Sequence, residues 1–328
     1  MKKNRAGNEW FKEKEASTST RPYRLTFWCL THFPRWLMNG LIYLVSFYFF
    51  IFDKRCRHES IRYQKTLKAF NPSIKGATPF RQVVAFAVNI VEKIDCWTNP
   101  ISLKNIHNNG DVQVLVDHLN QGKGAFVIVS HLGNSELLRS LANKNEIGVA
   151  KPIPITVLSD RDVSSNFSKA MTQISKHFYL NTINVNDITP ATIERIQETI
   201  SQGGLVVCAG DRLSKNKKER VLSHSFLGKE APFSYGAYYL VDLVAAPVYF
   251  IWGFRKNSLT LSRDYEMTVV KAKSSVGGSR AGREKRMNDL LDEYVKKLEE
   301  FVQLYPCQWY NFFDFWMFPN SEANGEKK

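Results

Sequence analysis

A chain of 328 residues is long enough for one large α/β domain with a sizeable core or for two smaller domains, and we expect one domain preceded by an N-terminal anchor. The net charge of +14 predicts a polyanionic partner, either nucleic acid or an anionic membrane surface. The five cysteines are scattered, odd in number and without a CxxC pair. They predict reduced thiols in a cytosolic setting and argue against a disulfide framework and a zinc site.

The first distinctive segment is an apolar run over residues 36–52, which contains no charged side chain. As a helix it would be roughly 26 Å long, which is marginal for the ~30 Å hydrocarbon core of a bilayer. Basic residues flank it on both sides, so charge asymmetry does not reveal its topology. We predict a basic N-terminal segment over 1–33 and a membrane anchor over 34–53, which either spans the bilayer or lies in its interface. A buried core helix is the alternative.

Beyond this run, apolar patterns typical of helices and strands alternate, which predicts an α/β domain over residues 54–318. Its central sheet should be mostly parallel or mixed and flanked by helices. The expected helices are 59–70, 80–96, 163–177, 190–202 and 281–304. The expected strands are 124–130, 153–158, 180–185, 205–209, 248–254 and 259–261, the last as a partner of 267–270. Residues 319–328 have the composition of a disordered tail.

A histidine and a carboxylate lie five residues apart where the 124–130 strand should turn into a helix, at His131 and Glu136. Both side chains would converge at the carboxyl end of a strand, where open α/β sheets usually bind their ligands. A neutral imidazole can take a proton from a hydroxyl or amine, and a carboxylate fixes its tautomer and stabilises the imidazolium that forms. The pair therefore predicts a catalytic dyad. An acid in the first turn of a helix is also favoured by the macrodipole alone.

A second charged pair, Asp211 and Arg212, directly follows the expected 205–209 strand, so it also lies at a strand's carboxyl end. An arginine in this place can hold a phosphate. The residues that follow predict a mobile basic loop, with Lys215, Lys217, Lys218 and Arg220. The alternative is a solvated loop with a local Asp–Arg pair.

Two further segments are rich in apolar side chains. Residues 226–233 predict a turn that leads into a mostly apolar helix over 234–240, which fits either the wall of an acyl-chain groove or the core. Residues 305–316 follow the long 281–304 helix and are dense in aromatic side chains. A segment of this kind must be buried or lie at a membrane surface.

Taken together, these segments resemble the lysophospholipid acyltransferase superfamily, in its branch of bacterial lipid A biosynthesis (late) acyltransferases. The resemblance spans nearly the whole chain. In chain order it rests on Trp10, 60–63, 86–94, the 131–136 box, Arg139, 211–212, 226–228, Pro306 and 309–316. The closing aromatic string is most similar to a subgroup of predicted acyltransferases that is related to the lipid A enzymes but distinct from them.

The resemblance implies a membrane-associated acyltransferase that moves a fatty acyl group from acyl carrier protein or acyl-CoA to the oxygen or nitrogen of a lipid or glycolipid acceptor. His131 would be the general base and Glu136 would orient it, while positive side chains and backbone amides stabilise the oxyanion. The implied substrate contacts are Gly133, Asn134, Ser135, Arg139, Asp211, Arg212, Phe226 and Gly228. Ser135 stands where the family often has an aromatic residue, which should change the shape of the acceptor site.

The implied partners are acyl carrier protein, the lipid acceptor and the membrane, without nucleic acid. The implied location is the bacterial inner membrane, with the catalytic domain on its cytoplasmic face. No metal or cofactor besides the acyl donor is expected, because no histidine spacing supports a metal site. Two other classes compete with an enzyme. A nucleic-acid-binding protein would explain the charge, although the chain shows no known module of that kind, and a non-catalytic membrane-surface protein would use the same fold.

Overall fold

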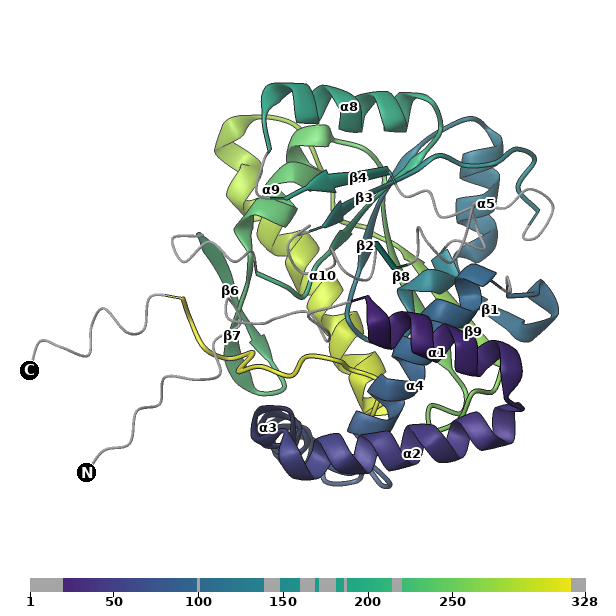
Figure 1. Ribbon diagram of the computed structural model, residues 1–328. Helices are drawn as coiled ribbons and strands as arrows, with labels where there is room; N and C mark the ends of the chain where they lie inside the picture. Colours follow the sequence, from purple (N-terminus) through teal and green to yellow (C-terminus); the bar gives the residue numbers. More distant parts are fainter. Residues whose placement is uncertain are drawn as a thin grey trace, which may run out of the picture.

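The centre of the molecule is a seven-stranded sheet with the strand order β1-β9-β8-β2-β5-β3-β4, and helices cover both of its faces (Figure 1). This computed structural model describes residues 20–98, 101–138, 148–159, 169–170, 181–185, 188–213 and 220–319. The strands are β1 (Ile106–Gly110), β2 (Ala125–Val129), β3 (Ile155–Ser159), β4 (Asn181–Asn184), β5 (Leu205–Ala209), β8 (Val248–Arg255) and β9 (Tyr265–Lys271). Within the described part of this seven-stranded sheet, β8 and β9 pair antiparallel and the other pairs are parallel. The predicted α/β class with a mostly parallel sheet is confirmed.

The middle strands of the sheet face two separate apolar cores. The even-numbered residues of β2 belong to one core, together with residues of α9 (Tyr235–Val244) and α10 (Arg283–Leu304). Its odd-numbered residues pack in the other core, together with residues of α5 (Val112–Asn120). Because both faces are covered, a middle strand is apolar at nearly every position, which is why β2, β5 and β8 are recognisable as continuous apolar runs in the sequence.

Several predicted elements differ from those in the structure. Residues 259–261 form a turn instead of a strand, and β9 pairs directly with β8. The sequence interpretation missed β1, α5 and the hairpin of β6 (Val221–Phe226) and β7 (Lys229–Ser234). In β1 four of the five residues are exposed at the sheet edge, so the strand lacks the apolar signal that a buried strand shows. The predicted 163–177 helix lies outside the described residues, except for 169–170.

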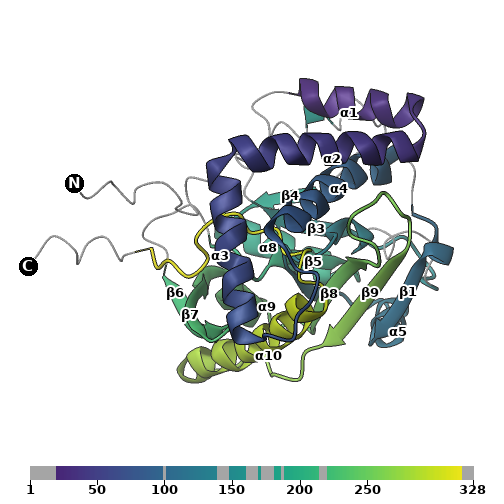
Figure 2. The same cartoon turned by 90° about the horizontal axis from the view of Figure 1, so that it is seen from below.

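Four helices form the N-terminal part of the described chain: α1 (Arg21–His32), α2 (Arg35–Phe52), α3 (Lys54–Phe70) and α4 (Pro79–Thr98). Figure 2 shows that α2 lies along the domain and crosses α4. Among the described helices, α2 is long and apolar enough, by length and composition, to cross a membrane. Only 17% of it is buried, so it is not a core helix. The α8 helix (Pro190–Ser201) covers the opposite end of the sheet in Figure 1.

Candidate active site

The pairing of β2 with β5 brings together two side chains that are 80 residues apart in the chain. In this parallel register Val129 lies opposite Ala209, the last residue of each strand. The pairing continues for one more step, because Gly210 N donates to Val129 O at 2.8 Å. His131 and Asp211 each lie two residues beyond their strand, so they meet at the carboxyl edge of the sheet.

His131 and Asp211 are joined by two hydrogen bonds. The ring atom His131 Nδ1 lies 2.9 Å from Asp211 Oδ1, and the backbone His131 N donates to Asp211 Oδ2 at 2.9 Å. Burial of the Asp211 carboxyl would raise its pKa, but the charge and hydrogen bonds of His131, together with the charge of Arg212, hold that pKa below its ordinary value. An ionised carboxylate only accepts hydrogen bonds, so in the neutral imidazole the proton is on Nδ1 and the lone pair is on Nε2.

The two partners differ in their access to solvent. The side chain of His131 is 38% exposed, whereas that of Asp211 is fully buried. An exposed imidazole supported by a buried carboxylate is the arrangement of a general base with its orienting group. The Asp211 carboxylate is buried and accepts hydrogen bonds from protein donors, and its predicted substrate contact stays a prediction.

The segment that follows α10 also contacts this pair. Trp309 forms an antiparallel bridge with Leu132, and Tyr310 N donates to His131 O at 2.9 Å. The side chains of Trp309 and Asn311 donate to Asp211 Oδ2 at 3.1 and 3.3 Å. Sequence reasoning predicted that this aromatic segment is buried or at a membrane, and missed its contact with the histidine loop. The polar Asn311 and Asp314 interrupt the aromatic string and are its sequence signal.

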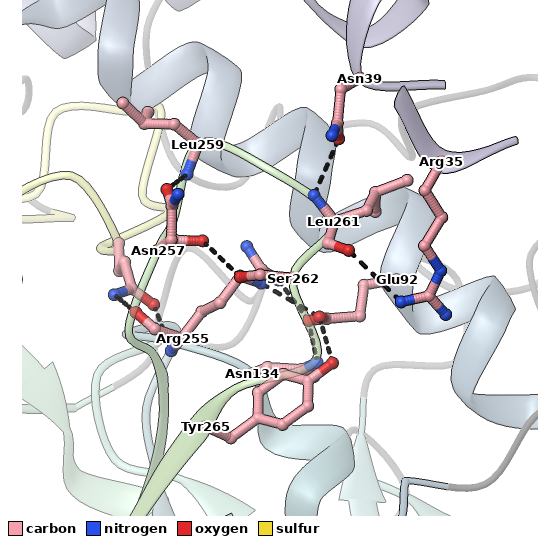
Figure 3. A network of polar contacts seen from close by, with 11 residues as sticks. Arg35, Asn39, Glu92, Asn134, Arg255, Asn257, Leu259, Leu261, Ser262 and Tyr265 are labelled. Carbon is pink, nitrogen blue, oxygen red and sulfur yellow. Dashed lines mark hydrogen bonds and ion pairs between the residues drawn. The ribbon is translucent and has the colours of Figure 1, made fainter. Parts of the chain in front are cut away.

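A buried polar network around Glu92 holds Asn134, which lies in the loop after His131 (Figure 3). Asn134 Nδ2 donates to Glu92 Oε2 at 2.6 Å, and Tyr265 OH donates to Glu92 Oε1 at 2.5 Å. Both oxygens of Glu92 also accept from the guanidinium of Arg255. Burial would lower the pKa of Arg255, but Glu92 raises it overall. Asn134 is buried in this network, so its position indicates support of the loop, and its predicted substrate contact stays a prediction.

The backbone of the predicted tight turn requires a glycine at position 133. Gly133 has a φ of +80°, and a Cβ atom there would lie 2.1 Å from Gly253 O. The loop therefore packs directly on β8, where Asn134 N donates to Gly253 O at 2.6 Å. Ser135 is exposed at the start of the short 3-10 helix η3 (Ser135–Leu137), so it remains a candidate for substrate contact.

Arg212 is half-buried beside the pair, and its guanidinium contacts the C-terminal segment. Its Nε atom donates to Asn311 Oδ1 at 2.9 Å, and its Nη2 atom donates to Tyr310 O at 3.4 Å. The guanidinium also lies 5.0 Å from the ring centroid of Phe313. These contacts place a cation close to the His131–Asp211 pair, and phosphate binding by Arg212 stays a prediction.

Phe226 and Gly228 lie in the β6–β7 hairpin, and their predicted substrate contacts stay predictions. Phe226 is fully buried and contacts the aromatic rings of Trp309 and Phe315, so it belongs to the core. Gly228, with a φ of +72°, forms the β6–β7 turn together with Leu227, whose φ is +51°. A hairpin turn of this kind needs positive φ, which explains the glycine without a ligand.

Some predicted site residues lie outside the described part of the structure. This applies to Arg139, to the lysines at 215, 217 and 218, and to the side chain of Glu136. Orientation of His131 by Glu136 therefore stays a prediction. Arg220 is described, and its guanidinium lies 4.3 Å from the ring centroid of Tyr235.

Comparisons with known proteins do not assign the chain to a family. No protein-family model matches it, and no curated protein is significantly similar. Among the described residues, no group of three or more His, Cys, Asp or Glu side chains could hold a metal ion.

Proposed function

We propose that the protein is a membrane-associated acyltransferase in which His131 is the general base and Asp211 orients it. The observation that supports this most directly is the hydrogen bond from the ring of His131 to a buried, ionised carboxylate at the carboxyl ends of two adjacent parallel strands. That arrangement suits removal of a proton from a hydroxyl or amine. The acyl substrate is proposed from the resemblance of the motifs.

In the proposed reaction, His131 Nε2 takes the proton of the acceptor hydroxyl or amine as its oxygen or nitrogen attacks the thioester carbonyl. The tetrahedral oxyanion then collapses and the carbon–sulfur bond breaks. The thiolate leaving group takes the proton back from the imidazolium, so the products are the acylated acceptor and the free thiol. Asp211 stabilises the imidazolium between the two proton transfers. Arg212, which is hydrogen-bonded to Asn311 beside the pair, would hold an acceptor phosphate or stabilise the oxyanion.

The acceptor is proposed to be a lipid or glycolipid because of the surface of α2. This helix exposes many large apolar side chains, most of them in its second half: Trp36, Tyr43, Leu44, Val45, Phe47, Tyr48, Phe49, Ile51 and Phe52. Exposed apolar surface on this scale favours contact with a membrane or another partner. The exposed arginines Arg21 and Arg24 on α1 and Lys54 after α2 suit anionic headgroups.

The contacts of α2 favour an orientation in the plane of the membrane. Near its start, Leu261 N donates to Asn39 Oδ1 at 2.9 Å, and near its end Arg57 Nη1 donates to Phe50 O at 3.0 Å. Met38 and Ile42 in the first half of α2 pack against α4. A helix attached to the domain along its length can bury its outer face in the interface without leaving the domain. Interfacial binding is therefore our proposal, in place of a spanning anchor.

The proposed activity is tested with full-length protein in mixed micelles of detergent and bacterial lipid extract, with acyl carrier protein or CoA thioesters as donors. Mass spectrometry of the lipids would reveal both the acyl group and the acceptor. We expect His131→Ala to abolish transfer. The matched control is His107→Ala, because His107 also lies 3.0 Å from an aspartate, Asp264, but at the surface and away from β2.

Two results would overturn the proposal. One is a His131→Ala protein that keeps nearly wild-type turnover. The other is wild-type protein that transfers no acyl group from either donor while it binds vesicles or nucleic acid, which would support one of the non-catalytic classes. Loss of activity in the His107→Ala control would show that the assay reports folding rather than chemistry.

A further inference from the structure

The two oxygens of Asp211 have different partners. Asp211 Oδ1 lies 2.9 Å from His131 Nδ1 and accepts its hydrogen bond. Oδ2 accepts three hydrogen bonds, from His131 N at 2.9 Å, Trp309 Nε1 at 3.1 Å and Asn311 Nδ2 at 3.3 Å. Three donors on one oxygen resist rotation of the carboxylate, so the other oxygen stays directed at the imidazole.

The two donor side chains are themselves held in place. Trp309 is fully buried, and its carbonyl accepts from Gln82 Nε2 at 2.7 Å. The side chain of Gln308 is bound to the backbone of Arg255 at both ends, with distances of 3.0 and 2.8 Å. Asn311 is also buried, and its Oδ1 accepts from Arg212. Hydrogen bonds with Gln82, Arg255 and Arg212 therefore hold residues 308–311 in place beside the Asp211 carboxylate.

We propose that Trp309 and Asn311, in the segment after α10, are positioning residues for the His131–Asp211 pair. Asn311 joins two groups of the site, because its amide donates to Asp211 while its carbonyl accepts from Arg212. Removing either donor would let the carboxylate rotate and weaken its bond to the imidazole. The activity part of this inference rests on the proposed function, but the effect on the imidazole does not.

The test compares Asn311→Leu and Trp309→Phe with wild-type protein. Asn311→Leu keeps a similar shape without the amide, and Trp309→Phe removes the indole N–H. The matched control is Trp316→Phe, because Trp316 lies in the same segment and its Nε1 donates at 3.1 Å to Phe226 O, away from Asp211. Thermal unfolding verifies that each variant is folded. If Trp309→Phe does not fold, Asn311→Leu decides the outcome.

The main measurement is nitrogen-15 NMR of the imidazoles in full-length protein in detergent, with the His131 signals identified through His131→Gln among seven histidines. We expect the wild-type ring to keep its proton on Nδ1. Both test variants should show mixed tautomers and a His131 pKa lower by about half a unit to one unit, because a charge-assisted hydrogen bond is weakened. Trp316→Phe should match wild type.

In the acyltransferase assay both variants should lower kcat by about 10- to 100-fold with little change in KM, as expected when a group that orients a catalytic residue is lost. If the tautomer and titration of His131 in a folded Asn311→Leu protein equal those of wild type, the segment only packs and the inference is wrong. If the NMR changes occur in a protein that transfers no acyl group, the positioning role stands and the proposed function fails.

Discussion

Glu92 and Arg255 form an ion pair that is almost completely shielded from water, with side chains 4% and 1% exposed. Glu92 comes from α4 and Arg255 from the end of β8, and the same carboxylate binds the loop after His131 through Asn134. The pair therefore connects the N-terminal helices, the sheet and the candidate active site. Its partners Tyr265 and Asn134 satisfy oxygens that the guanidinium alone would leave with unused lone pairs.

Removing one partner of this pair should be costly, because the other charge would stay buried without compensation. We expect Arg255→Leu to lower the free energy of unfolding by about 3–5 kcal/mol in urea titrations. Lys285→Ala is the control, since it breaks the exposed Lys285–Asp289 pair and should cost under about 1 kcal/mol. Similar losses in the two variants would contradict the structural importance of the buried pair.

We expect substitutions of Asp211 and Glu136 to lower kcat by different amounts. Because Asp211 contacts Nδ1 of His131, Asp211→Asn should lower kcat by about 10³- to 10⁴-fold, as an amide cannot hold the same tautomer. We expect Glu136→Gln to lower kcat less. Steady-state kinetics with a saturating acceptor provide the comparison. The reverse order would assign the orienting role to Glu136, as the sequence resemblance implies.

The hydrogen bonds of the Asp242 carboxylate predict that the folded protein loses stability in acid. Hydrogen bonds from Arg286 hold its pKa below the ordinary value of 3.8, against the effect of burial, and Arg283 also contributes. A carboxyl whose pKa is lower in the folded state stabilises that state above its unfolded pKa and loses the contribution as pH falls through the folded pKa.

The arginines do not titrate in this range, so the effect belongs to Asp242. Asp242→Asn should therefore destabilise the protein at pH 7, and the difference from wild type should shrink below about pH 4, as measured by urea unfolding at a series of pH values. A difference that is the same at pH 7 and pH 3 would refute this origin.

The exposed face of α2 predicts a specific effect on membrane binding. Replacing Leu44 and Phe47 by glutamate should weaken sedimentation with vesicles that contain anionic lipid, because apolar burial is lost and negative charge is added. Leu304→Glu is the control, since Leu304 is 63% exposed at the end of α10 and away from α2. Binding that is released by salt alone would instead assign attachment to the basic residues.

The pattern of apolar residues within one segment was sufficient to predict those elements whose structure depends mainly on that segment. The strands β2, β5 and β8 could be predicted from their apolar runs, and Gly133 from the need for a tight turn after β2. Neither β1 nor the β6–β7 hairpin could be predicted in this way. Exposed edge residues and alternating burial leave a weak apolar signal, and pairing with a neighbour is what makes these segments strands.

The sequence by itself determined the class of the fold and the place of His131 at the carboxyl end of a buried strand, because both follow from short-range hydrophobicity and turn chemistry. Only the tertiary structure showed that Asp211 binds the imidazole. Glu136 is close in sequence, but the order of strands in a parallel sheet depends on packing between distant segments. That order sets β5 beside β2, brings Asp211 to His131, and allows the segment after α10 to complete the site.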